Sequence, residues 1–186
     1  MAAQLDVLAE GYAQDRVAST VVLVRDGDTV IVVDPGMVAS REVILAPLAA
    51  LGVDVADVTD VVLSHHHPDH TINVALFPRA RVHDFQATYL GDVWEDADAD
   101  RALSPHVALM ATPGHTDQDV STLVSTADGL VVCTHLWWSA DGPAEDPFAP
   151  DADRLAASRR AVLDLSPALV LPGHGAGFVP GPDTPR

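Results

Sequence analysis

The chain has 186 residues, of which 48% are hydrophobic and 20% charged, and this composition excludes wholesale disorder. Ten basic residues, all of them arginine, stand against 27 acidic residues, and the formal net charge is -17. Such a surface repels polyanions, so we expect no nucleic-acid partner and no docking on anionic membranes. Length and composition predict a single domain over residues 1–186, with a proline-rich tail from about residue 176.

Two features of the sequence predict a cytoplasmic protein. The single cysteine, Cys133, excludes an internal disulfide framework and suits a reducing compartment. Residues 1–14 lack the basic start and apolar run of a signal peptide, and no apolar run approaches the roughly 20 residues that a membrane helix needs. Predicted edge strands and exposed tryptophans allow a homodimer, although no pattern in the sequence requires one.

The hydrophobic pattern predicts a sheet-rich fold with helices packed outside the sheets. Two strands, at residues 20–25 and 29–33, flank the tight turn Asp26-Gly27-Asp28. A helix over about residues 41–51 begins after Ser40 as its cap. Further strands are expected at residues 59–64, 80–83, 107–111, 120–126, 130–134 and 168–171, further helices at residues 71–77 and 151–164, and loops at residues 92–100 and 139–150.

Histidines carry the functional signal. Four of the nine lie in the segment Ser64-His65-His66-His67-Pro68-Asp69-His70, directly after a predicted buried strand. In extended backbone residues two apart point the same way, so His65, His67 and Asp69 share a side while His66 faces the opposite one. The segment thereby offers three imidazoles and a carboxylate in a small volume, which is a ligand set for a divalent cation that needs no thiolate.

Two later segments repeat a simpler pattern. Thr112-Pro113-Gly114-His115-Thr116 and Leu171-Pro172-Gly173-His174-Gly175 each follow a predicted strand, and in each a Pro-Gly turn places a histidine just beyond the strand end. Glycine at these turns permits a close backbone approach beside a crowded centre. Together with the first segment, they predict a site assembled at one edge of the sheets.

These segments resemble the metal-binding motifs of the metallo-β-lactamase superfamily, from about Thr20 to His174, and Asp34-Pro35-Gly36 resembles its early Asp-x-Gly turn. Arg81-Val82-His83-Asp84-Phe85 and the short chain look most similar to the small group around metallo-β-lactamase domain-containing protein 1. The resemblance implies an α/β fold, a four-layer αββα sandwich of two mixed β-sheets flanked by helices. It also implies two metal sites at one edge, formed by His65, His67 and His115 and by Asp69, His70 and His174.

One position departs from the superfamily pattern. After the predicted strand at residues 130–134 the superfamily usually has Gly-Asp, whose carboxylate bridges both ions, whereas this chain has Thr134-His135. A carboxylate can bridge ions roughly 3.5–4 Å apart, but a neutral imidazole has one free lone pair and cannot bridge in that way. His135 therefore either binds one ion alone or points away and leaves a single strong site, and we expect direct ligation.

The ligand set predicts a metal-dependent hydrolase. A dication held by neutral imidazoles lowers the pKa of its bound water to roughly 7, which makes a metal-bound hydroxide available to attack a carbonyl or phosphoryl centre. Asp69 is the expected catalytic residue, because it can hold the water and accept its proton while it touches the second ion. Zinc is the expected metal, at one or two ions per chain, with iron or manganese as alternatives.

A small ester, thioester, lactone or amide is the expected substrate, because the chain has no lysine near the site and no room for the extra domains of larger superfamily members. A phosphodiesterase or nuclease is the alternative enzyme, which the net charge of -17 disfavours. A metal-binding module without turnover and a di-iron redox centre are the alternatives from other classes.

Two residues are predicted to contact the substrate. His83, at a strand end, either contacts the substrate or supports the histidine cluster. Of Trp137 and Trp138, one is expected to wall the substrate pocket while the other packs, and we assign the pocket position to Trp137. His66 is expected to be structural, and residues 139–150 are expected to be solvated surface, with a rim over the site as the alternative.

Overall fold

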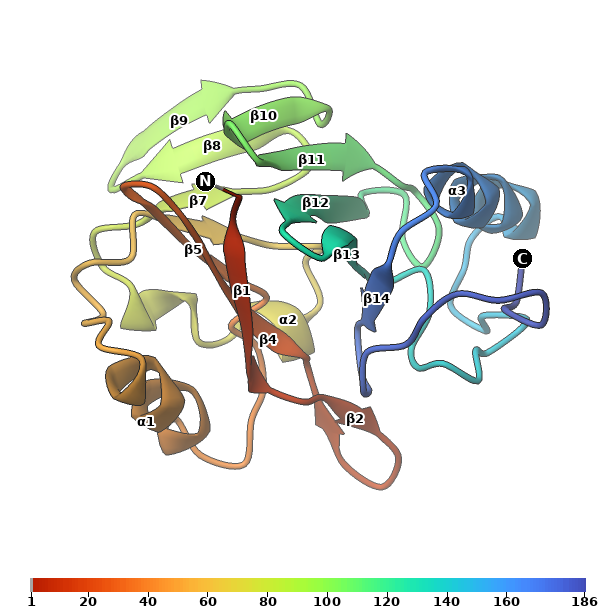
Figure 1. Ribbon diagram of the computed structural model, residues 1–186, viewed down its shortest axis with the longest axis horizontal. Coiled ribbons are helices and arrows are strands. Elements are labelled where there is room, and N and C mark those ends of the chain that lie inside the picture. Colours follow the sequence, from red (N-terminus) through yellow and green to blue (C-terminus); the bar gives the residue numbers. More distant parts are fainter. Residues whose placement is uncertain (1) are drawn as a thin grey trace.

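Two mixed β-sheets packed face to face form the centre of the structure, a computed structural model that describes residues 2–186 (Figure 1). A helix covers the outer face of each sheet. The layers therefore run helix, sheet, sheet, helix, and the predicted four-layer αββα sandwich is confirmed.

The first sheet has seven strands in the order β1-β4-β5-β6-β7-β8-β9. Its inner strands β5, β6 and β7 run parallel to one another, whereas the remaining pairs are antiparallel. The strand bounds are Gln4–Ala9 for β1, Val21–Asp26 for β4, Thr29–Val33 for β5, Asp60–Val62 for β6, Arg81–His83 for β7, Ala87–Leu90 for β8 and Val93–Asp96 for β9.

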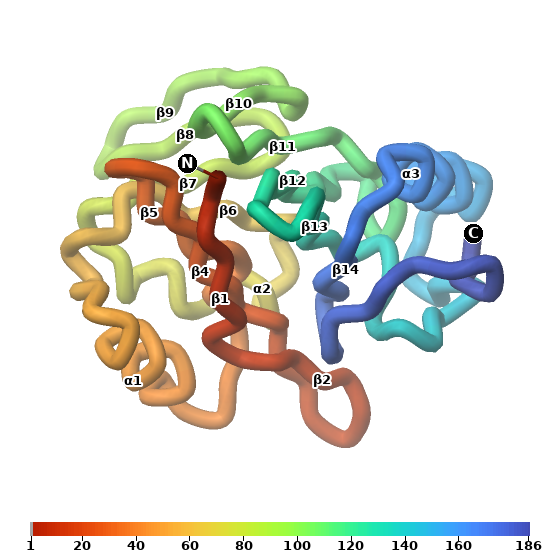
Figure 2. The backbone as a smooth tube through the Cα atoms, viewed as in Figure 1, coloured from red at the N-terminus to blue at the C-terminus, as the bar shows by residue number. Residues whose placement is uncertain are grey.

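The second sheet has five strands in the order β10-β11-β12-β13-β14, of which β13 and β14 are parallel. Its strands are β10 (Arg101–Ser104), β11 (Val107–Ala111), β12 (Val120–Thr126), β13 (Gly129–Thr134) and β14 (Leu169–Pro172). A small hairpin of β2 (Tyr12–Ala13) and β3 (Val17–Ala18) projects from the sandwich, at the lower end of the tube in Figure 2.

Three apolar layers explain why the central strands are largely hydrophobic. In β4, Val21 and Leu23 pack toward helix α1 (Glu42–Ala50), while Val22 and Val24 pack toward the second sheet. Successive strand residues face opposite sides, so a strand covered on both faces needs apolar residues at every position. The prediction of a buried strand around residues 59–64 is explained in the same way, because β6 is covered on both faces.

Helix α3 (Ala152–Asp164) covers the second sheet and agrees with the predicted helix at residues 151–164. The Asp151 side chain caps it by accepting hydrogen bonds from the backbone N–H groups of Asp153 and Arg154. Leu155 and Val162 are buried in the apolar cluster between the helix and the sheet. The apolar side of the helix thus fixes its contact face.

Several predicted elements differ from the structure. Residues 92–100 were expected to be a loop but include β9, an edge strand whose side chains are all exposed and therefore show no buried alternation. Strand β1 was not predicted, and the predicted helix at residues 71–77 is replaced by the short α2 (Pro68–Thr71) and the 3₁₀ turn η1 (Val74–Leu76). Ser40 does not cap α1, whose N-cap is Arg41 without a side-chain cap bond.

A hydrogen-bonded pair within the first sheet, on the adjacent strands β6 and β7, involves His83, which was predicted to contact the substrate. His83 Nε2 lies 2.7 Å from Asp60 Oδ1, its Nδ1 lies 3.1 Å from Thr88 Oγ1, and both His83 and Asp60 are buried. Burial raises the pKa of Asp60, but the hydrogen bonds from His83 and Thr59 outweigh it and leave this pKa below its usual value. That prediction is therefore wrong, because β7 and β8 hold this side chain inside the sandwich.

Replacing His83 with alanine should destabilise the protein without changing substrate affinity. The change leaves a buried carboxylate without its main partner, which costs about 2 kcal/mol and lowers the Tm by about 4–8 °C near neutral pH. Since the pKa of Asp60 is depressed in the folded state, this contribution is present above its unfolded pKa of about 3.9 and is lost as the pH falls below it. Thermal unfolding of the wild type and His83→Ala between pH 3 and pH 7 tests this, and a rise in KM without a fall in Tm would contradict it.

Candidate metal centre

The predicted ligands meet at one edge of the sandwich, where strands of both sheets end. His65 and His67 follow β6, and Asp69 and His70 lie in α2. The remaining histidines, His115, His135 and His174, follow β11, β13 and β14. All seven predicted metal ligands are therefore brought together, from segments that span more than a hundred residues of chain.

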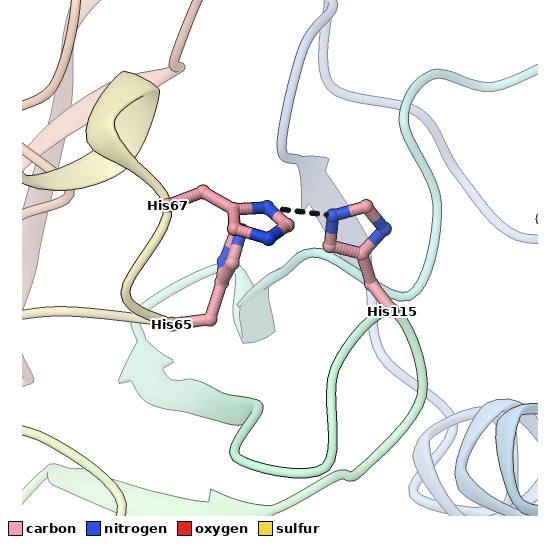
Figure 3. A group of neighbouring side chains, drawn as sticks. All are labelled: His65, His67 and His115. Atoms are coloured by element: carbon pink, nitrogen blue, oxygen red, sulfur yellow. Dashed lines mark hydrogen bonds between the residues drawn. The ribbon is translucent and has the colours of Figure 1, made fainter. Parts of the chain in front are cut away.

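A first set of three donors consists of His65, His67 and His115, whose ligand nitrogens all lie within 4.8 Å of one another. Nδ1 of His67 is 3.1 Å from Nε2 of His115, and Figure 3 shows the three rings facing one another. His66 instead turns away, with its Nε2 2.8 Å from Asp84 Oδ2. The alternation inferred from extended backbone therefore matches the orientation of these three neighbouring side chains.

A second set consists of Asp69, His70 and His174, whose ligand atoms also lie within 4.8 Å of one another. Oδ2 of Asp69 is 3.5 Å from Nε2 of His70 and 3.5 Å from Nε2 of His174. The helix α2 that carries Asp69 lies tightly against the Asp-x-Gly turn. A Cβ atom on Gly36 would lie only 1.7 Å from the carbonyl oxygen of Asp69, so only glycine fits there.

Hydrogen bonds on the side away from the centre orient three of the histidine rings. Nδ1 of His70 donates to Asp34 Oδ2 at 2.9 Å, and Nδ1 of His174 donates to the carbonyl oxygen of Ala18 at 2.9 Å. Nδ1 of His115 donates to Asp146 Oδ2 at 2.8 Å. Because Nδ1 carries the proton in each ring, the lone pair of Nε2 is directed at the centre, as metal ligation requires.

The donor set fits a divalent cation. His65 Nε2, His70 Nε2 and His135 Nδ1 are buried nitrogens without a hydrogen-bond partner within the described residues 2–186. Burial, followed by repulsion between the neighbouring imidazoles, lowers the pKa values of His65 and His135 well below the usual range. Neutral, unpartnered imidazoles in a buried cluster are the chemistry that a dication binds, because metal ligation needs the deprotonated ring nitrogen.

Asp146 is a residue of the site that the sequence did not reveal. Its Oδ2 accepts hydrogen bonds from His115 Nδ1 and, at 2.9 Å, from Trp138 Nε1, while its Oδ1 accepts from the backbone N–H of Phe148. Burial raises the pKa of Asp146, but these hydrogen bonds outweigh it and leave the pKa below its usual value. The carboxylate therefore stays ionised and joins a ligand of the first set to two aromatic residues.

The segment around Asp146 is held in place by α3. Arg159 is buried and donates hydrogen bonds to three carbonyl oxygens. These belong to Leu136 at 2.9 Å, Ala144 at 2.8 Å and Pro143 at 2.7 Å. Residues 139–150, expected to be solvated surface, therefore contain a fixed segment that reaches the site. The alternative prediction, a rim over the site, describes it better.

A pocket of about 470 Å³ opens directly over the donors. Trp138 and Phe148 form one wall, with ring centroids 5.8 Å apart and planes 19° apart, and the β2–β3 hairpin forms another. No arginine lies among the described residues that line it, which are Ala13, Gln14, Val17, His67, Asp69, His115, Trp138, Phe148 and His174. The pocket therefore offers apolar walls beside donors of both sets.

Trp137 does not line this pocket, and its predicted contact with the substrate is wrong. The side chain is fully buried against the Arg159 guanidinium and the Phe178 ring, and its Nε1 donates to the carbonyl oxygen of Pro185. Trp138 takes the pocket position instead. Neighbouring residues of extended chain face opposite sides, and two adjacent tryptophans do not reveal from sequence which of them faces the site.

The comparisons with known proteins agree with this geometry. Residues 15–85 match the model of the Metallo-beta-lactamase superfamily. Metallo-beta-lactamase domain-containing protein 1 of Xenopus laevis is 34% identical over 192 residues, which cover 92% of this chain and 79% of that protein. The chain belongs to the metallo-β-lactamase superfamily. The resemblance to the group around domain-containing protein 1 is confirmed as well, although the chain spans only 59 to 62% of the human, mouse and rat proteins of that name.

Solved structures support the fold of this superfamily member. A Thermotoga maritima protein described as a metallo-beta-lactamase superposes with a TM-score of 0.75 at 21% identity, over 97% of this chain and 100% of the other. An N-acyl homoserine lactone hydrolase, with its product bound at the catalytic metal centre, superposes with a TM-score of 0.69 at 17% identity, over 93% and 92%. No helix in residues 2–186 is long and apolar enough to cross a membrane.

Replacing Asp146 with asparagine should weaken metal binding at the first donor set. The asparagine amide has one acceptor oxygen in place of two, and its NH₂ group would face the N–H groups that the carboxylate accepts. The hydrogen bond that orients His115 is therefore lost, and metal affinity falls about 10- to 100-fold. Competition with a chelator measures this affinity. Asp141→Asn, an exposed carboxylate in the same loop, is the matched control and should bind metal like the wild type; an unchanged affinity in Asp146→Asn would remove Asp146 from the site.

Proposed function

We propose that the protein is a zinc-dependent hydrolase of a small, uncharged ester, thioester, lactone or amide. Its superfamily and its donor set support metal-dependent hydrolysis in general. The finer proposal rests on one observation: three convergent imidazoles lie beside a pocket that has apolar walls and no arginine among the described residues of its lining. Zinc accords with imidazole and carboxylate donors in the absence of a thiolate, although iron and manganese bind such sets too.

A bound zinc ion would supply a Lewis acid for the substrate carbonyl and would lower the pKa of a bound water to roughly 7. His65, His67 and His115 would hold it beside the pocket, because His67 and His115 line that pocket. Asp69 also lines the pocket, and its Oδ2 faces His70 and His174. We assign to this carboxylate the acceptance of a proton from the attacking water and its delivery to the leaving group.

The negative charge of the chain and the apolar residues of the pocket walls support an uncharged substrate. The chain has no lysine, and no arginine lies among the described residues of the pocket lining. The formal net charge of -17 also repels phosphodiesters and nucleic acids at a distance. Val17, Trp138 and Phe148 instead present surface that favours an apolar acyl or ring group. A lactone such as the one named for the N-acyl homoserine lactone hydrolase is a member of this class.

A substrate panel tests the function directly. Initial rates of the zinc-loaded protein on lactones, thioesters, uncharged esters, amides and bis-nitrophenyl phosphate should favour the carbonyl substrates by at least about 100-fold, and a chelator should abolish turnover. Asp69→Asn should lower kcat by about 10²- to 10⁴-fold, the usual contribution of a general acid–base residue. Turnover of the phosphodiester alone would support the nuclease alternative, and tight metal binding without any turnover would support a non-catalytic module.

Replacing Phe148 with alanine should raise the KM for esters with long or aromatic acyl groups about 10-fold and leave that for acetyl esters nearly unchanged. The lost ring removes apolar contact from one wall of the pocket but is not itself a metal donor, so kcat should change little. Trp94→Ala removes an exposed aromatic residue from β9 and is the matched control. An equal change of KM for both kinds of ester would contradict an acyl-binding role.

A further inference from the structure

His135 occupies the position where the superfamily usually has a bridging aspartate, and it does not point away from the centre. Its side chain is 2% exposed, and its ring centroid lies 4.6, 4.7, 4.2 and 4.9 Å from those of His65, His70, His115 and His174. A Cβ atom on Gly173 would lie 2.4 Å from His135 Cδ2, so glycine at this turn gives the ring its space. The imidazole is therefore built into the middle of the donor cluster.

The contacts of His135 associate it with the second donor set. Its Nε2 lies 3.0 Å from Nε2 of His174, and the His174 lone pair is free for a cation because Nδ1 of that ring donates to Ala18. Two nitrogens about 2.0–2.1 Å from one zinc ion are separated by about 3.3 Å at tetrahedral angles, close to this spacing. Ligand nitrogens of His135 also lie within 4.8 Å of those of His65, His70 and His115, which belong to both sets, so the 3.0 Å approach to His174 is the contact that favours the second set.

We propose that His135 is a fourth ligand of the ion bound by Asp69, His70 and His174, and that it does not bridge two ions. One carboxylate and three imidazoles then fill the second site with protein donors, whereas the first site has three imidazoles and keeps a position for water or substrate. Sites closed by four protein ligands are typically structural, and sites with an open position are catalytic. The chain thus divides the roles between its two sites.

The division rests on the number of protein donors at each site and not on exposure. His67 and His115 of the first set and Asp69 and His174 of the second all line the pocket, while His65, His70 and His135 are buried behind them. Without a bridging carboxylate the repulsion between the two ions is offset less, so they should bind in two separate phases, the second ion more weakly than the first. The second site should be the tighter one because it has more donors and a negative charge. The catalytic role of the first site rests on the proposed function, but the ligand assignment does not.

Metal titration of the metal-free protein tests the assignment without any substrate. Cobalt(II), followed by its visible absorption and by elemental analysis, should load the wild type in two phases, with two ions bound at saturation. His135→Ala should weaken the tighter phase at least about 10-fold and leave the weaker phase unchanged, whereas His67→Ala should affect only the weaker one. His135→Gln, which keeps a polar side chain of similar size, repeats the test if the alanine variant does not fold.

His66→Ala is the matched control, because this neighbouring imidazole faces Asp84 and not the cluster, and it should load like the wild type. His135→Asp, which supplies a carboxylate, should bring the two phases together into cooperative loading. Equal weakening of both phases in the His135 variants, no weakening of either, or a single ion per wild-type chain would overturn the assignment. A protein that loads as described but turns over no substrate would contradict the proposed function and leave His135 as a ligand.

Discussion

The convergence of buried, uncharged imidazole nitrogens on one small volume is the constraint on which the site depends. A buried polar atom without a partner destabilises a fold by about 1–3 kcal/mol, and three ring nitrogens of this cluster have none among the described residues. Protonation offers no relief, because each added charge would repel the neighbouring rings. Divalent ions at the two donor sets would give Nε2 of His65 and Nε2 of His70 a partner, so metal binding and the stability of this edge should be coupled.

The acceptors behind the rings come from three separate parts of the chain. Asp34 belongs to the turn after β5, Ala18 to the hairpin strand β3, and Asp146 to the loop after β13. The orientation of each ring therefore depends on the correct packing of a distant segment. Asp146 adds a second link, since the same carboxylate holds His115 and the aromatic wall of the pocket. A change in the shape of that wall is transmitted to a metal ligand through one side chain.

Local sequence predicted those parts of the site that follow from backbone geometry. The separation of His66 from His65 and His67 follows from strand alternation alone, and the turns before His115 and His174 follow from Pro-Gly pairs. The direction in which a side chain points was predicted wrongly where the local sequence carries no information about it. Trp137 and Trp138 are chemically identical neighbours, so only the packing of Trp137 against Arg159 and Phe178 decides between them.

Long-range pairing explains the remaining differences from prediction. Asp146 is one acidic residue in a loop rich in proline and aspartate, and nothing in its neighbourhood indicates that its carboxylate is buried against a histidine 31 positions away. His83 is hidden for the same reason, because its partner Asp60 lies on the adjacent strand β6. Strand β9 has exposed side chains on both faces, and its pairing with β8 therefore leaves no hydrophobic signature.

The use of arginine links the fold to the choice of substrate. Arg159 is committed to backbone carbonyls that fix the pocket loop, Arg101 donates to the carbonyls of Asp84 and Ala87, and Arg25 and Arg154 pair with acidic residues. These four arginines thus hold loops and strands of the acidic chain, and no arginine lies among the described residues that line the pocket. Positive charge in the pocket would come from the metal centre alone. With the second site closed by four protein donors, one ion would face the apolar walls, and a neutral carbonyl group matches that single positive charge better than a polyanion does.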